Sequence, residues 1–191
     1  MLTQIQAARI HREGQSASLA EELAQGGTQD AIELLLSCHQ RIRHFTRLAV
    51  LLSQAPATAA EVAQAALAVH RYYSQALPLH EADENESVYP RLRAAAPPAE
   101  LAAANQAMVD QHRALDANIA RLLPLWTAIA AAPARAAEAR AGAEQLQEAW
   151  DEHLELEERC VFPALREWLS PLDLEAIRRE MRERRALAAA I

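Results

Sequence analysis

The chain has 191 residues, of which 51% are hydrophobic and 4% aromatic, and its formal net charge at pH 7 is −7. This length fits one domain with a single core, and abundant Ala with scarce Gly favours helices. The acidic balance argues against a nucleic-acid partner, no apolar run is long enough to cross a bilayer, and two cysteines without a secretory leader predict a cytoplasmic protein.

Residues 1–28 predict a short N-terminal helix or arm, because a weak amphipathic pattern there is broken by Gly14 and closed by two further glycines. Residues 29–168 predict the main domain, since apolar residues recur at helical spacing in four long stretches. These stretches cover about 29–54, 58–88, 98–131 and 133–162. Pro78 lies inside the second stretch and is expected to kink it.

Residues 169–191 predict one more helix, packed across the others. Ser170 suits the N-cap of that helix, and Pro171 suits its first position. The predicted fold class is therefore all-α, with a four-helix bundle, a short N-terminal element and an additional C-terminal helix. Cys38 and Cys160 are both expected to be small buried side chains.

One motif occurs twice in the chain. Both copies read His-x3-Glu-x3-Val-aromatic-Pro-x-Leu, and they begin at His80 and His153. The offset between the two copies also relates His39 to His112, so each half places a lone His at the same distance before a His-x3-Glu pair. Residues i and i+4 share one face of a helix, so the lone His must come from a facing helix. The pattern therefore predicts a metal site inside a four-helix bundle.

Six residues are the candidate metal ligands: His39, His80, Glu84, His112, His153 and Glu157. All of them fall on the apolar faces of their helices, where unpartnered charged groups are costly and metal coordination is the obvious compensation. Hydrogen-bonded His–Glu pairs without metal are the alternative, but a repeated six-residue pattern favours the metal. The residue types allow iron, manganese, zinc, cobalt or nickel.

The order of lone His, His-x3-Glu, lone His and His-x3-Glu resembles the hemerythrin-like, HHE cation-binding family over roughly residues 29–168. The resemblance extends to the Tyr89-Pro90 and Phe162-Pro163 pairs, which close the metal-bearing helices in that family. It implies an up-down-up-down four-helix bundle around a non-haem di-iron centre. It also implies the ligand roles: His39 and His80 on one iron, His112 and His153 on the other, and Glu84 and Glu157 as bridges. An oxo or hydroxo group would complete the bridge, and manganese or zinc are substitutes for iron.

The sequence departs from the oxygen-carrying members of that family, which have a further His on the third helix, four residues from the first. Here the two such positions hold Met108 and Asp116. Met suits hard iron poorly, whereas Asp116 can bind the metal or act on a ligand. Tyr73, two turns before His80 on the same face, is either a core aromatic or a donor to a bound ligand. Exchangeable positions on both metals favour a reactive or sensing centre over oxygen carriage.

The leading hypothesis is a non-haem di-iron protein that binds or senses oxygen, nitric oxide or peroxide. Iron storage or donation, including repair of iron–sulfur centres, is the alternative from another class. A third hypothesis is an interaction module that metal only stabilises. The sequence indicates no substrate pocket, so we assign no enzyme class, and both a monomer and a homodimer fit.

Overall fold

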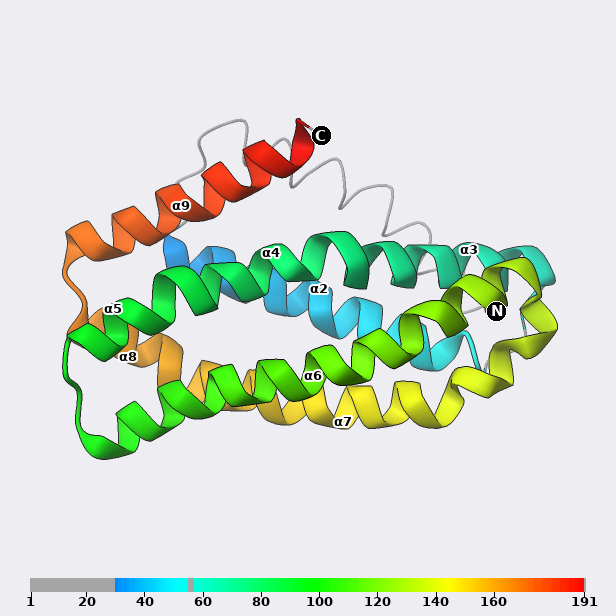
Figure 1. The fold of residues 1–191 in the computed structure, drawn as a ribbon, viewed down its shortest axis with the longest axis horizontal. Coiled ribbons are helices and arrows are strands. Elements are labelled where there is room, and N and C mark those ends of the chain that lie inside the picture. Colours follow the sequence, from blue (N-terminus) through cyan, green and yellow to red (C-terminus); the bar gives the residue numbers. More distant parts are fainter. Residues whose placement is uncertain (1–29, 55–56, 191) are drawn as a thin grey trace.

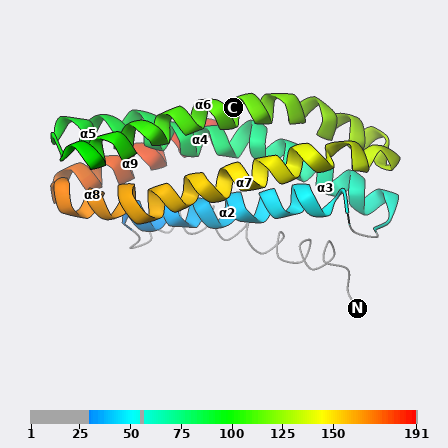
Figure 2. The same cartoon turned by 90° about the horizontal axis from the view of Figure 1, so that it is seen from below.

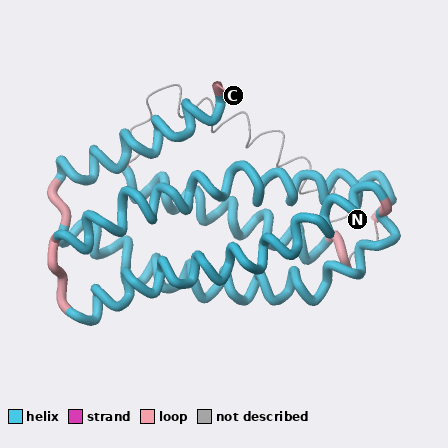
Figure 3. The backbone as a smooth tube through the Cα atoms, viewed as in Figure 1, coloured by secondary structure: helices cyan, strands magenta, loops and turns pink. Residues whose placement is uncertain are grey.

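The structure is a computed structural model that describes residues 30–54 and 57–190. Within these ranges the chain forms helices and no strands (Figure 3). Four long rods run up, down, up and down along an elongated bundle, and a fifth helix lies along its outside (Figure 1). The predicted all-α bundle with an additional C-terminal helix is confirmed. The arm expected over residues 1–28 lies outside the described residues.

The first two rods both begin at a capping box, in which two side chains satisfy each other's free backbone N–H groups. The first rod is α2 (Ala31–Leu51), capped by Asp30 and Glu33. The second rod is capped by Thr58 and Glu61. Its segments are α3 (Ala59–Arg71), η1 (Tyr72–Ala76), α4 (Leu77–Ala82), η2 (Asp83–Val88) and α5 (Tyr89–Ala94).

The third rod is one helix, α6 (Ala99–Ala131), which continues through Pro124. The fourth rod lies beside α2 (Figure 2) and consists of η3 (Pro133–Ala139), α7 (Arg140–Leu156), η4 (Glu157–Val161) and α8 (Phe162–Trp168). The outer helix is α9 (Pro171–Ala189), which begins at the predicted Ser170 cap and packs on α2, α4 and η2. None of the described helices combines the length and the apolar character that crossing a bilayer requires.

Three wide π-helical segments interrupt the second and fourth rods, and a proline follows each of them. Pro78, Pro90 and Pro163 stand two residues after the ends of η1, η2 and η4. Proline donates no backbone hydrogen bond and its ring crowds the carbonyl four residues earlier, and a π-helical turn accommodates both effects. The second and fourth rods therefore continue to Ala94 and Trp168, and do not close at the two aromatic-Pro pairs as we expected.

The π segment η4 also changes which residues of the fourth rod face the core. A π turn holds more residues than an α turn, so inward positions recur at longer intervals. Val161, four residues after Glu157, is buried, whereas Cys160 is exposed. The prediction of two buried cysteines is therefore right for Cys38 and wrong for Cys160.

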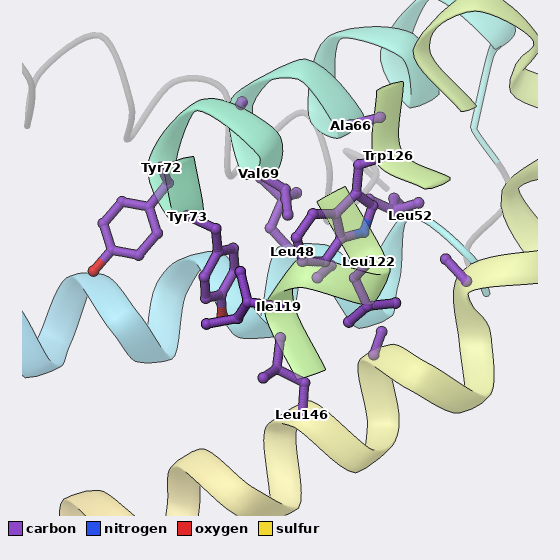
Figure 4. Close-up of a cluster of buried hydrophobic side chains, with 14 of the residues drawn as sticks. Leu48, Leu52, Ala66, Val69, Tyr72, Tyr73, Ile119, Leu122, Trp126 and Leu146 are labelled. Atoms are coloured by element: carbon purple, nitrogen blue, oxygen red, sulfur yellow. The ribbon is translucent and has the colours of Figure 1, made fainter. Parts of the chain in front are cut away.

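Two apolar clusters fill the bundle, one on either side of a polar layer. In the larger cluster Tyr73 stacks on Trp126, with ring centroids 5.2 Å apart, among aliphatic side chains from several rods (Figure 4). The smaller cluster includes Leu35, Val88, Met108, Phe162 and, from α9, Ile177 and Met181. On every rod a candidate ligand falls between the two clusters; His39, for example, lies between Leu35 and Ile42. The polar layer is therefore sealed from water at both ends.

Candidate metal centre

The structure brings all six candidate ligands together in this polar layer. They come from every rod of the bundle: His39 from α2, His80 from α4, Glu84 from η2, His112 from α6, His153 from α7 and Glu157 from η4. None of the six is more than 2% exposed. Glu157 is the first residue of the π segment η4, and Glu84 is the second residue of η2. Such π-helical segments often mark functional sites.

Each glutamate points one carboxylate oxygen towards one pair of histidines and the other oxygen towards a second pair. We call His39 and His80 the first pair, and His112 and His153 the second pair. Glu84 Oε1 lies 3.4 Å from His80 Nε2, and its Oε2 lies 3.2 Å from His112 Nε2. Glu157 mirrors this arrangement: its Oε2 lies 3.0 Å from His39 Nε2, and its Oε1 lies 3.0 Å from His153 Nε2.

These contacts define two overlapping groups of four residues, each compact enough to hold one metal ion. One group joins the first pair to both glutamates, and the other joins the second pair to the same glutamates. In the second group His112 Nε2 and His153 Nε2 are 3.1 Å apart. Two nitrogens bound to one ion at about 2.1 Å and at right angles would be about 3 Å apart. The arrangement therefore suggests a binuclear metal site with shared carboxylates.

Several polar atoms of the cluster lack hydrogen-bond partners among the described residues, and this also fits metal coordination. His39 Nε2, both ring nitrogens of His80 and all four carboxylate oxygens of Glu84 and Glu157 are buried without a hydrogen-bond partner among the described residues. The carboxylate–imidazole approaches above are close, but none of them among the described residues has hydrogen-bond geometry. Polar atoms buried without partners are costly, and a bound cation would satisfy these lone pairs together.

Three histidines are oriented by a bond to the ring nitrogen that points away from the cluster. His39 Nδ1 pairs with Glu158 Oε1 at 2.8 Å. His112 Nδ1 pairs with Asn85 Oδ1, and His153 Nδ1 with Gln111 Oε1, both at 3.0 Å. An acceptor at Nδ1 keeps the proton there and leaves the Nε2 lone pair for a metal.

These three outer residues were not predicted from the sequence, although the repeat contains a signal for two of them. Asn85 and Glu158 each directly follow a glutamate of the cluster, so they occupy equivalent positions in the two copies of the motif. They were missed because the motif was defined by identical residues. An amide and a carboxylate are different residue types, but each offers an oxygen that accepts from an imidazole N–H here.

The electrostatics of the cluster favour ionised carboxylates. Burial raises the pKa of Glu84, but the rings of His80 and His112 lower it well below its usual range. Burial and the charge of Glu84 raise the pKa of Glu157, and contacts with His153 and His39 reverse the shift and lower it. Burial lowers the pKa of His39, but its carboxylate partners raise it well above the ordinary value. Negative carboxylates and positive imidazoles thus stabilise each other in the core, and a bound cation would take the place of that positive charge.

Three further residues that the sequence pointed to lie outside these groups. Asp116 is exposed and interacts with Glu81, and Met108 is packed in the smaller apolar cluster. The Tyr73 hydroxyl pairs with Thr46 Oγ1 at 2.7 Å. Neither metal-sized group therefore includes a seventh protein ligand from the described residues.

A model of the hemerythrin HHE cation-binding domain matches residues 30–165, a range that includes all six cluster residues. The chain belongs to the hemerythrin HHE family. A second match covers residues 103–191, and its start is displaced from the start of the first match by the offset of the internal repeat. The second match to this hemerythrin domain therefore begins at the position of the second repeat that corresponds to the start of the first match. No curated protein and no solved structure matches the chain.

Proposed function

We propose that this hemerythrin-domain protein holds two iron ions at the cluster and that the ion pair binds a small ligand: oxygen, nitric oxide or peroxide. In this proposal the first and second histidine pairs each bind one iron, and Glu84 and Glu157 bridge them. The observation that supports it most strongly is the division of each carboxylate between the two pairs, with oxygen–nitrogen distances of 3.0 to 3.4 Å.

The number of protein donors supports ligand binding over a purely structural metal. Each metal-sized group offers two imidazoles and one oxygen from each of two carboxylates. Iron accepts up to six donors, and histidine–carboxylate sites with open positions are typical of non-haem iron centres that use oxygen. Bound iron would supply redox chemistry and positions for a solvent bridge and an external ligand.

The surrounding protein limits what that external ligand can be. The cluster residues are at most 2% exposed, and the apolar side chains of Phe162 and Trp150 lie against them. His39 contacts the Phe162 ring at 4.8 Å between centroids, and His153 contacts Trp150 at 5.3 Å. Such a buried layer excludes bulk water and admits only molecules of a few atoms.

The test begins with metal analysis of protein purified without oxygen, followed by addition of oxygen or nitric oxide to the reduced, iron-loaded chain. We expect two irons per chain and a new visible absorption band with either gas. His80→Ala combined with His153→Ala removes one ligand from each pair and should abolish both results. His70→Ala is the matched control, because His70 lies on the second rod outside the cluster.

Iron donation, the alternative function, predicts a different outcome of the same preparation. A donor transfers its iron to an apo iron–sulfur protein and loses it readily to a chelator. The deep burial of all six residues favours retention of the iron. An iron-loaded chain whose spectrum neither gas changes, and which gives up its iron to an acceptor, would contradict ligand binding and support donation.

A further inference from the structure

The outer partners of the histidines follow the internal repeat, but the two halves use different chemistry. Glu158 and Asn85 occupy equivalent positions, and each bonds the lone histidine of the opposite half, His39 and His112 respectively. The bond to His39 is made by a carboxylate, whereas the bond to His112 is made by a neutral amide. A charged acceptor roughly doubles the strength of such a bond.

The other equivalent pair of outer positions is Cys38 and Gln111, which directly precede His39 and His112. Gln111 Oε1 lies 3.0 Å from His153 Nδ1. Cys38 interacts with His80, but neither ring nitrogen of His80 has a hydrogen-bond partner of normal geometry in the described part of the chain. In the second pair both histidines therefore have a hydrogen-bond partner at Nδ1. In the first pair, among the described residues, only His39 has one.

Glu158 is itself held in place by a cation. Its Oε1 accepts from Arg43 Nη1 at 2.8 Å and also lies 2.8 Å from His39 Nδ1. The Glu158 and Arg43 side chains are 29% and 35% exposed, so this contact connects a buried ring to the surface of the bundle. In the second half the position equivalent to Arg43 holds Asp116, which provides no such cation.

We propose that Glu158 is the positioning residue of the first metal position: through His39 it sets the affinity of that position alone. The proposal rests on the metal-binding function proposed above. A carboxylate at Nδ1 orients the imidazole and makes its Nε2 a better donor, and removing such partners typically lowers metal affinity by about 10- to 100-fold. Within the described ranges, His39 is the one ring of the first pair that has an Nδ1 partner, and Glu158 is that partner. Loss of Glu158 should therefore affect the first position more than loss of Asn85 affects the second.

The test is competition between the protein and a chelator for Co²⁺, with the visible spectrum as readout. His153→Ala disables the second position, and His80→Ala disables the first. In the His153→Ala chain we expect Glu158→Ala to weaken Co²⁺ binding by at least about tenfold. Glu158→Gln, which keeps an acceptor oxygen, should restore part of that loss. In the His80→Ala chain neither Glu158 variant should change the affinity.

Two controls separate positioning from general damage to the fold. Glu155→Gln changes an exposed carboxylate on the same rod whose partner among the described residues is Arg159, and it should change neither affinity. Asn85→Ala should weaken the second position by less than Glu158→Ala weakens the first. If Glu158→Ala lowers the Co²⁺ affinity of both positions equally, or leaves that of the first unchanged, the role proposed for Glu158 is wrong. Two bound metals per wild-type chain would still support the metal-binding function in that case. A wild-type chain that binds no Co²⁺ would overturn both.

Discussion

Arg185 of the outer helix α9 donates to Asp83 Oδ2 at 2.7 Å, and Asp83 directly precedes the cluster residue Glu84. The same Arg185 nitrogen approaches Cys38 Sγ at 3.6 Å, next to His39. Arg184 donates to the other oxygen of Asp83 at 3.0 Å. Asp83 is fully buried, so α9 supplies the two cations that neutralise a carboxylate beside the cluster.

Arg185→Ala is expected to destabilise the protein by about 3 kcal/mol, because it leaves a buried carboxylate with one cationic partner. Urea unfolding followed by circular dichroism measures the change. Arg179→Ala on the same helix is the control, because Arg179 forms an exposed pair with Glu183 and its loss should stay within about 0.5 kcal/mol. Equal stability of the two variants would contradict a structural role for the contact between α9 and Asp83.

Metal removal is expected to lower the stability of the folded chain. A ligand that binds only the folded state at 100 times its dissociation constant contributes about 2.7 kcal/mol. Thermal unfolding with and without a chelator should therefore differ by several degrees in Tm. The chain with both His80→Ala and His153→Ala should unfold at a temperature that the chelator does not change. A chelator-independent Tm of the wild type would count against metal binding.

The contribution of Asp30 to the stability of the fold is expected to depend on pH in the acid range. This residue is the N-cap of α2 and is not part of the cluster. Burial raises its pKa, but the backbone N–H of Glu33 and the Arg166 guanidinium together outweigh this and lower the pKa below its usual value. The folded chain therefore holds Asp30 ionised at a pH where the unfolded chain has begun to protonate it. Its contribution is complete above about pH 4 and disappears as the pH falls through the lowered pKa.

Asp30→Ala also removes the N-cap of α2 and should cost about 1 kcal/mol at neutral pH. Urea unfolding from pH 7 down to pH 3 should show this difference shrink in the acid range. Asp30→Asn keeps a capping oxygen without the charge and should lose less at neutral pH. A difference between Asp30→Ala and wild type that grows towards pH 3 would refute the assigned direction.

Tyr73→Phe tests whether the buried hydroxyl serves the fold or the metal. The hydroxyl pairs with Thr46, which also donates to the backbone oxygen of Ile42. Thr46 therefore keeps a partner in the variant, and we expect a loss of about 1 kcal/mol. The metal content should remain that of the wild type. Loss of bound metal from a folded Tyr73→Phe chain would show that the hydroxyl contributes to the site.

The sequence predicted the bundle and the six cluster residues because both leave periodic signals. Apolar residues at helical spacing identified the rods, and the internal repeat placed His80 and Glu84 in the same relation as His153 and Glu157. A helix converts spacing along the chain directly into a shared face, so a residue pattern is enough to predict the site.

Only the tertiary structure decided the features that depend on contacts between distant segments. The bonds from Glu158 to His39 and from Arg185 to Asp83 join residues that are far apart in the chain, and no periodicity records such a contact. The π segments could not be predicted from the sequence either. A proline inside a helix can cause a kink, a break or a π turn, and the packing of the rods selects among these. Local spacing therefore determined which residues gather in the core, and three-dimensional packing determined which partners orient them.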